Sequence, residues 1–167
     1  MDLIHVAIVE DEPLFVQQLK EYIGRYEKDR GRRIKITTFA DGEDITDDYR
    51  GGYDIILMDI QMRFMDGMTA AEKIRTLDHE VIIMFITNMI QYAVRGYEVD
   101  AMDYVVKPVE YFAFSQKLDK AIGRMKKAVQ TYISVPTEDG LQKLAVSDIY
   151  YIESQGHNAC YRTARGE

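Results

Sequence analysis

The chain has 167 residues, of which 28 are acidic and 21 are basic, giving a net charge of -7, and 47% of its residues are hydrophobic. This composition excludes disordered and disulfide-stapled proteins, since the single cysteine, Cys160, cannot form an internal disulfide. The acidic total argues against a mainly electrostatic hold on nucleic acid, and no apolar run approaches the ~20 residues of a membrane helix. We expect a packed cytoplasmic protein that does not enter a membrane.

Short apolar runs alternate with segments of helical periodicity along the first 130 residues. The expected strands are His5–Val9, Ile34–Phe39, Ile55–Met58, Val81–Ile86 and Tyr104–Val106. The expected helices are Phe15–Tyr26, Gly42–Tyr49, Gly67–Leu77, Ile90–Tyr97 and Phe114–Val129, and Asp66 is expected to cap the third of them. This alternation predicts an α/β fold with a doubly wound parallel sheet, covered by helices on both faces.

After residue 130 the pattern changes to short alternating runs separated by turn signals, such as Pro136 and Asp139-Gly140. The sequence therefore predicts two parts, an α/β domain over residues 1–130 and a short β segment over residues 131–167. The second part is too short to be expected to fold as an independent domain.

Polar residues follow four of the expected strands. Glu10 and Asp11 come after the first strand, Asp59 after the third, Thr87 after the fourth and Lys107 after the fifth. Because the carboxyl ends of parallel strands meet at one edge of a sheet, these groups are expected to lie together, where magnesium would keep the carboxylates ionised. A carboxylate between a cation and an ammonium group can attack a phosphoryl group, so Asp59 is a candidate phosphate acceptor. Each residue alone has a structural explanation, and the prediction depends on their joint placement.

Five sequence blocks resemble, in order and in spacing, the receiver domain of two-component response regulators. They are Val9–Pro13, Ile56–Met62, Asp66–Met68, Phe85–Asn88 and Asp103–Pro108. The resemblance implies a flavodoxin-like five-stranded sheet in the order 2-1-3-4-5 and phosphorylation of Asp59 by a sensor histidine kinase. It also implies magnesium held by the side chains of Asp11 and Asp59 and by the backbone carbonyl of Gln61.

The same resemblance assigns roles to further residues. Glu10 would bind the metal directly or through a metal-bound water, and Lys107 would pair with the phosphoryl group, with a cis Lys107–Pro108 peptide. Thr87 would move toward the phosphoryl group and Tyr104 would swing inward to fill the vacated space, so that the two residues form a switch.

The last part of the chain resembles regulators whose output is a LytTR-type DNA-binding domain, of which only the start is present. The resembling segments are Gly96–Pro108 and Ile149–Ser154. The resemblance makes His157 a candidate base contact and Arg162 and Arg165 candidate phosphate contacts, although a solvated loop also explains His157. DNA binding is expected of the complete domain and not of this chain.

We therefore expect a non-enzymatic response regulator that switches a transcriptional output. Its expected partners are a sensor histidine kinase, DNA through the complete output domain, and a second copy of the chain. The copies would associate, more strongly after phosphorylation, near Ile90–Tyr97 and Lys117–Lys127.

Three other interpretations of the sequence are possible. One is a stand-alone receiver that signals by protein contacts. Another is a magnesium-dependent aspartyl-phosphate phosphatase, for which Gln61 stands where a general acid is required. The third is a flavin or dinucleotide binder, which would need a glycine-rich loop where residues 10–13 are mostly acidic.

Overall fold

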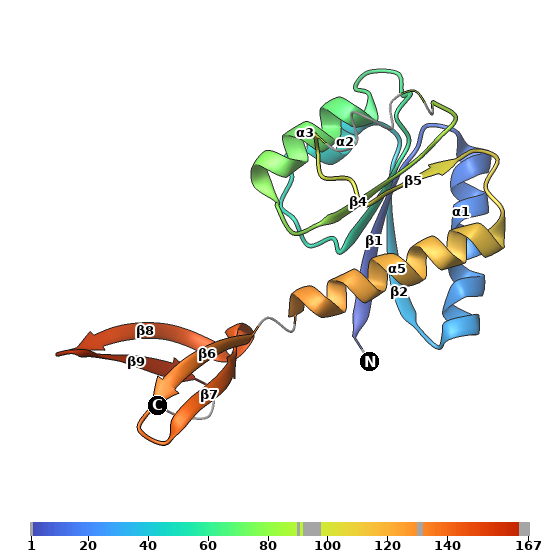
Figure 1. Ribbon diagram of the computed structural model, residues 1–167. Helices are drawn as coiled ribbons and strands as arrows, with labels where there is room; N and C mark the ends of the chain where they lie inside the picture. Colours follow the sequence, from blue (N-terminus) through green and yellow to red (C-terminus); the bar gives the residue numbers. More distant parts are fainter. Residues whose placement is uncertain (1, 90, 92–97, 130–131, 164–167) are drawn as a thin grey trace. The chain divides into compact units, whose positions relative to one another are not determined.

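A parallel sheet of five strands forms the centre of the larger part of the protein, in the order β2-β1-β3-β4-β5 (Figure 1). The computed structural model describes residues 2–89, 91, 98–129 and 132–163. The strands are β1 (Leu3–Val9), β2 (Arg33–Phe39), β3 (Ile55–Met58), β4 (Ile82–Thr87) and β5 (Asp103–Val106). Strands β3 and β4 are buried along their whole length, which explains their continuous apolar sequence. The predicted flavodoxin-like order is confirmed.

Helices cover both faces of this sheet. They are α1 (Pro13–Arg30), α2 (Gly42–Thr46), α3 (Gly67–Leu77) and α5 (Tyr111–Val129). Helices α2 and α3 lie on one face, and α1 lies on the other beside the first half of α5 (Figure 1). Asp66 caps α3 as predicted, because its side chain accepts a hydrogen bond from the Thr69 amide at 2.9 Å. No described helix combines the length and the apolarity that crossing a membrane requires.

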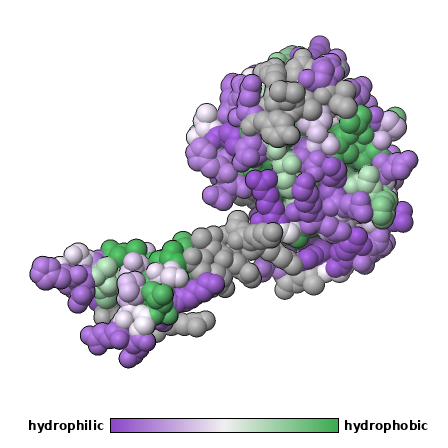
Figure 2. Space-filling model, in the orientation of Figure 1, coloured by the Kyte–Doolittle hydropathy of each residue, from purple (hydrophilic) through white to green (hydrophobic). Residues whose placement is uncertain are grey.

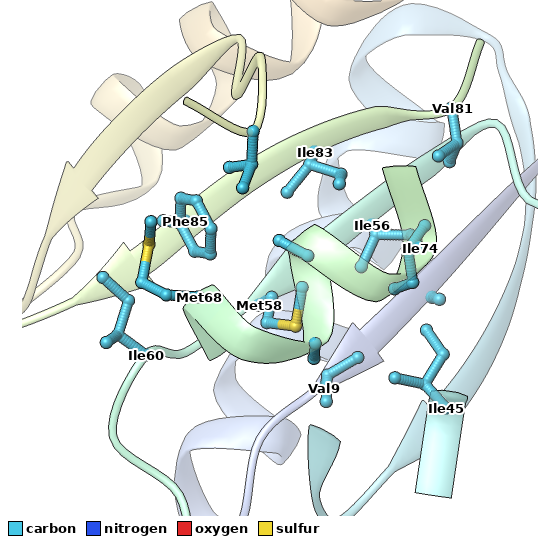
Figure 3. Close-up of a cluster of buried hydrophobic side chains, with 14 residues drawn as sticks. Val9, Ile45, Ile56, Met58, Ile60, Met68, Ile74, Val81, Ile83 and Phe85 are labelled. Atoms are coloured by element: carbon cyan, nitrogen blue, oxygen red, sulfur yellow. The ribbon is translucent and has the colours of Figure 1, made fainter. Parts of the chain in front are cut away.

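The core beneath α2 and α3 is made of side chains that come from β1, β3, β4 and the two helices (Figure 3). Its larger members include Val9, Ile45, Ile56, Met58, Met68, Ile74, Ile83 and Phe85, all nearly or fully buried. Burial of each such side chain contributes about 1.5–3 kcal/mol relative to exposure. Val9 and Met58 are the last residues of β1 and β3 and are aligned with each other, and Met58 is aligned with Phe85, two residues before the end of β4. This packing therefore lies directly beneath the edge of the sheet where the polar residues follow.

Helix α2 is shorter than the sequence predicted, since it ends at Thr46 and not at Tyr49. The backbone of Asp48 is left-handed, with φ of 53°, and the Tyr49 hydroxyl donates to Asp78 Oδ2 at 2.8 Å. The chain thus turns away from the helix direction after Thr46, and Tyr49 contacts the loop that precedes β4. The helix expected over Ile90–Tyr97 lies outside the described residues.

The remaining strands form two antiparallel hairpins. They are β6 (Tyr132–Thr137) with β7 (Gly140–Ala145), and β8 (Ile149–Gln155) with β9 (Asn158–Thr163). The turn expected at Asp139-Gly140 connects β6 and β7. Contacts within the chain define two units, residues 1–121 and 122–167.

The hairpins bury little apolar surface. Among their described side chains only Val135 is buried, whereas several large apolar side chains are exposed, namely Leu141, Val146, Tyr150, Tyr151 and Ile152. Apolar residues are accordingly visible on the surface of this unit (Figure 2). The larger unit, by contrast, has an extensive core of its own.

Candidate functional site

Backbone hydrogen bonds continue past the strand ends and carry the predicted site residues to one edge of the sheet. The Asp59 amide donates to the Val9 carbonyl at 3.0 Å, which holds Asp59 beside the end of β1. The Lys107 amide donates to the Thr87 carbonyl at 3.0 Å, which holds Lys107 beside the end of β4. The parallel register therefore gathers residues that are far apart in the sequence.

Lys107 contacts three members of a cluster of acidic side chains. Its Nζ is 2.9 Å from Glu10 Oε2 and 3.2 Å from Asp59 Oδ2, and 3.8 Å from Glu12 Oε1. Glu10 and Asp59 are only 3% and 5% exposed, so these charges are paired away from bulk water. Carboxylate oxygens of Glu10, Asp11, Glu12 and Asp59 all lie within 4.8 Å of one another.

This arrangement shifts the pKa values of the buried partners. Burial raises the pKa of Glu10 to about 7, and the nearby Asp59 charge adds to the effect, although the Lys107 hydrogen bond opposes it. Burial lowers the pKa of Lys107, but the contacts with Glu10 and Asp59 outweigh it, so the net shift is upward. One ammonium group contacts three of the four carboxylates, and a set of converging carboxylate oxygens fits a hard divalent cation such as magnesium.

The connection from β3 to α3 is held close to Asp59. Asp59 Oδ1 accepts a hydrogen bond from the Ile60 amide at 2.7 Å. Gly67 must be glycine, because an added Cβ would collide with the Asp59 carbonyl oxygen. Gln61 also lies in this connection, and its side chain is exposed.

The two expected switch residues contact the same backbone unit. Thr87 is fully buried and its Oγ1 accepts a hydrogen bond from the Met89 amide at 3.2 Å. The Tyr104 hydroxyl donates to the Met89 carbonyl at 3.1 Å, and its ring centroid is 5.7 Å from that of Phe85. Displacement of Met89 would therefore change the hydrogen bonds of both Thr87 and Tyr104. The Lys107–Pro108 peptide is cis, as the resemblance implied.

Sequence reasoning missed two residues at this site. The sequence predicts Phe15 only as part of a helix, yet Lys107 Nζ lies 4.1 Å from the centroid of its ring, in the geometry of a cation–π contact. Asp41 is buried between α2 and the β3–α3 connection. Its place before Gly42, at the start of an expected helix, was a capping signal that could have drawn attention to it.

The candidate DNA contacts lie in the smaller unit. His157 is exposed in the turn between β8 and β9, and Arg162 Nη2 is 3.1 Å from Glu153 Oε1 across the same hairpin. A cleft of about 590 Å³ runs between the hairpins and is lined by His157, Tyr161 and residues 135–138, among others. Arg165 lies outside the described residues.

Comparison with known proteins agrees with this geometry. The family model of the response regulator receiver domain matches residues 6–119. Transcriptional regulatory protein YpdB of Escherichia coli K12 is 30% identical over an alignment that covers 89% of this chain and 65% of the relative. The chain covers 64% and 65% of the lengths of the first two curated relatives that it matches, which is less than two thirds.

Two solved structures share the fold. The response regulatory domain of mrkE from Klebsiella pneumoniae is 30% identical with a TM-score of 0.67, and the match covers 74% of this chain and 99% of that one. Response regulator TrrA from Thermotoga maritima, solved in complex with Mg(2+)-BeF, is 26% identical with a TM-score of 0.62, covering 71% and 98%. Since the receiver family model spans well over half of the chain and includes the whole acidic cluster, this chain belongs to the response regulator receiver domain family.

Proposed function

We propose that Asp59 accepts a phosphoryl group from a sensor histidine kinase and that the phosphorylated chain controls a transcriptional output. The observation that carries this proposal is the position of Lys107, whose Nζ contacts both Glu10 and Asp59 within a cluster of carboxylates. A buried carboxylate beside an ammonium group is a suitable acceptor, because the ammonium neutralises charge on the incoming phosphoryl oxygens.

The transfer requires one bond to form and one to break. A carboxylate oxygen of Asp59 attacks the phosphorus of a phosphohistidine, the phosphorus–nitrogen bond breaks, and the imidazole leaves with the electron pair. Lys107 already lies 3.2 Å from Asp59 Oδ2, so it can contact the phosphoryl oxygens after only a small movement. Burial of Asp59 keeps competing water away from the reacting oxygen.

Magnesium is the proposed cofactor. Asp11 and Asp59 would bind it through their side chains and Gln61 through its backbone carbonyl, with Glu10 binding directly or through a water molecule. When bound, the ion supplies positive charge for the transferring oxygens. The close oxygens of the carboxylate cluster support this proposal, as does the Mg(2+)-BeF complex of the related regulator from Thermotoga maritima.

We propose that Thr87 and Tyr104 transmit the conformational change caused by phosphorylation. If the Thr87 side chain moves so that its hydroxyl donates to a phosphoryl oxygen, the movement is expected to break the 3.2 Å bond that its Oγ1 accepts from the Met89 amide. The Met89 carbonyl is the partner of the Tyr104 hydroxyl, so the same displacement changes the position of Tyr104. Two side chains that share one backbone partner can thus act together.

We propose a receiver over residues 1–130 and the beginning of a LytTR-type DNA-binding output over residues 131–167. The whole protein would be a cytoplasmic, non-enzymatic regulator whose homodimers are strengthened by phosphorylation. The name of the relative YpdB supports a transcriptional role. His157, Arg162 and Arg165 remain the proposed DNA contacts. Titrating an operator fragment with a chain that carries the complete output separates this role from that of a stand-alone receiver, which would not bind it.

Incubation with acetyl phosphate and magnesium, followed by intact-mass measurement, tests the acceptor. The native chain is expected to gain one phosphoryl group and Asp59→Asn none. Asp54→Asn is the matched control, because Asp54 lies just before β3, at the opposite end of that strand from Asp59, and accepts a hydrogen bond from the His5 amide. Equal labelling of Asp59→Asn and the native chain would refute the assignment.

A further inference from the structure

Asp41 is a buried carboxylate that joins two loops at the edge of the sheet. It is 5% exposed, and its Oδ1 accepts hydrogen bonds from the Glu43 amide in the first turn of α2 and from the Met65 amide, both at 2.9 Å. Its Oδ2 accepts from the Phe64 amide, also at 2.9 Å. One side chain therefore caps α2 and at the same time holds the end of the β3–α3 connection.

The other end of that connection is held beside Asp59. The Ile60 amide donates to Asp59 Oδ1 at 2.7 Å, and the Ile60 carbonyl accepts from the Gly67 amide at 2.8 Å. Gln61 lies between these bonds and the pair of amides that Asp41 holds at residues 64 and 65. The path of the backbone at Gln61 is thus constrained from both sides.

The approach of α2 to this connection is close. A Cβ added to Gly42 would lie 2.7 Å from the Met65 carbonyl oxygen and 2.9 Å from Ala70 Cβ, so the start of α2 packs directly against the end of the connection. Burial raises the pKa of Asp41, but the amides of Glu43, Phe64 and Met65 outweigh that effect and lower it. Asp41 is therefore ionised near neutral pH, and hydrogen bonds to an ionised acceptor are stronger than those to a neutral one.

We propose that Asp41 is a positioning residue for the metal site, acting through the β3–α3 connection on the backbone carbonyl of Gln61. This inference rests on the proposed function, which makes that carbonyl a metal ligand. Asp41 itself does not belong to the carboxylate cluster. It limits the conformations of the connection, so that less ordering is needed when Gln61 takes part in binding.

Asp41→Asn tests the proposal, because it preserves size but replaces one acceptor oxygen with a donor. Whichever way the amide turns, a donor faces either the Phe64 amide or the amides of Glu43 and Met65. The matched control is Asp78→Asn at the opposite end of the sheet. Asp78 also accepts three hydrogen bonds, two from the Glu80 and Val81 amides and one from the Tyr49 hydroxyl.

Mn2+ serves as a probe of the magnesium site, and its affinity for the unphosphorylated full chain is measured by electron paramagnetic resonance. The thermal unfolding of each variant is measured alongside. Both variants are expected to melt below the native chain. Only Asp41→Asn is expected to weaken Mn2+ binding, by about tenfold, the lower end of the effects seen for residues that support metal ligands. If Asp41→Asn is unfolded, Asp41→Ser, which retains a helix cap, is measured in its place.

Two results would overturn the role of Asp41. One is native affinity in the substituted chain, and the other is equal weakening in Asp41→Asn and Asp78→Asn, which would indicate a general loss of stability. Failure of the proposed function gives a different pattern, since then Asp59→Asn and the native chain would bind Mn2+ equally. Amide hydrogen exchange at Phe64 and Met65 serves as an independent readout and is expected to be faster in Asp41→Asn alone.

Discussion

The shifted pKa of Glu10 predicts that the metal affinity of this protein depends on pH. Glu10 is almost completely buried, and burial raises its pKa from 4.5 to about 7. A carboxyl group must lose its proton to act as a metal ligand, and its ionised form is also the stronger acceptor for a hydrogen bond from metal-bound water. Binding of magnesium therefore competes with protonation of Glu10 in the pH range just around neutrality.

The size of the effect follows from the titration of this one group. With a pKa of about 7, Glu10 is about 10% ionised at pH 6 and about 90% ionised at pH 8. The apparent affinity for magnesium is therefore expected to rise about tenfold between these pH values. In Glu10→Gln the affinity is expected to be lower at pH 8 and to change by less than about twofold over the same range, since the titrating group is gone.

Isothermal titration with MgCl2 at pH 6, 7 and 8 measures this dependence. Native and Glu10→Gln chains are compared in buffers of different ionisation enthalpy, which also reports the protons released on binding. An affinity that does not change with pH in the native chain would refute the reasoning. So would an equal pH dependence in both chains, because Glu10 would then not be the titrating group.

The same shift has a consequence for the stability of the metal-free protein. Because the folded-state pKa lies above the ordinary value of 4.5, the folded chain holds the Glu10 proton more tightly than the unfolded chain does. The stabilisation from this group is therefore fully present below pH 4.5 and is lost as the pH rises through about 7. Glu10→Gln is expected to show no such loss in denaturant unfolding between pH 5 and 8.

Two further substitutions test the packing around the site. Phe15→Leu removes the ring next to the Lys107 ammonium. Because such cation–π contacts contribute ~0.5–2 kcal/mol, the rate of labelling by acetyl phosphate is expected to fall a few-fold. An unchanged rate would show that the ring does not assist Lys107. Gly67→Ala brings a methyl group against the Asp59 carbonyl oxygen and is expected to lower the free energy of unfolding by about 1–3 kcal/mol. The control is Gly24→Ala within α1, where the added Cβ meets no atom within 4 Å, and this variant is expected to be more stable than the native chain by up to about 1 kcal/mol. Similar losses of stability in both variants would contradict this account.

Much of the larger unit could be predicted because the periodicity of its sequence is local. The apolar runs that became β1, β3 and β4 are recognisable without knowledge of their neighbours, and a parallel sheet brings the residues after them to a common edge. Glu10, Asp59 and Lys107 could be grouped for this reason. The end of α2 was predicted wrongly, because a contact between Tyr49 and Asp78, distant in sequence, takes the chain out of the helix.

The sequence alone determined which chemical groups this protein offers at the end of each strand, since residue type and strand periodicity are properties of short segments. How those groups affect one another depends on the packing of the folded chain. The raised pKa of Glu10 comes from burial by surrounding elements, the contact of Phe15 with Lys107 joins α1 to the end of β5, and the bonds of Asp41 join α2 to the β3–α3 connection. Burial and contacts between distant segments depend on packing in three dimensions, which no local pattern records.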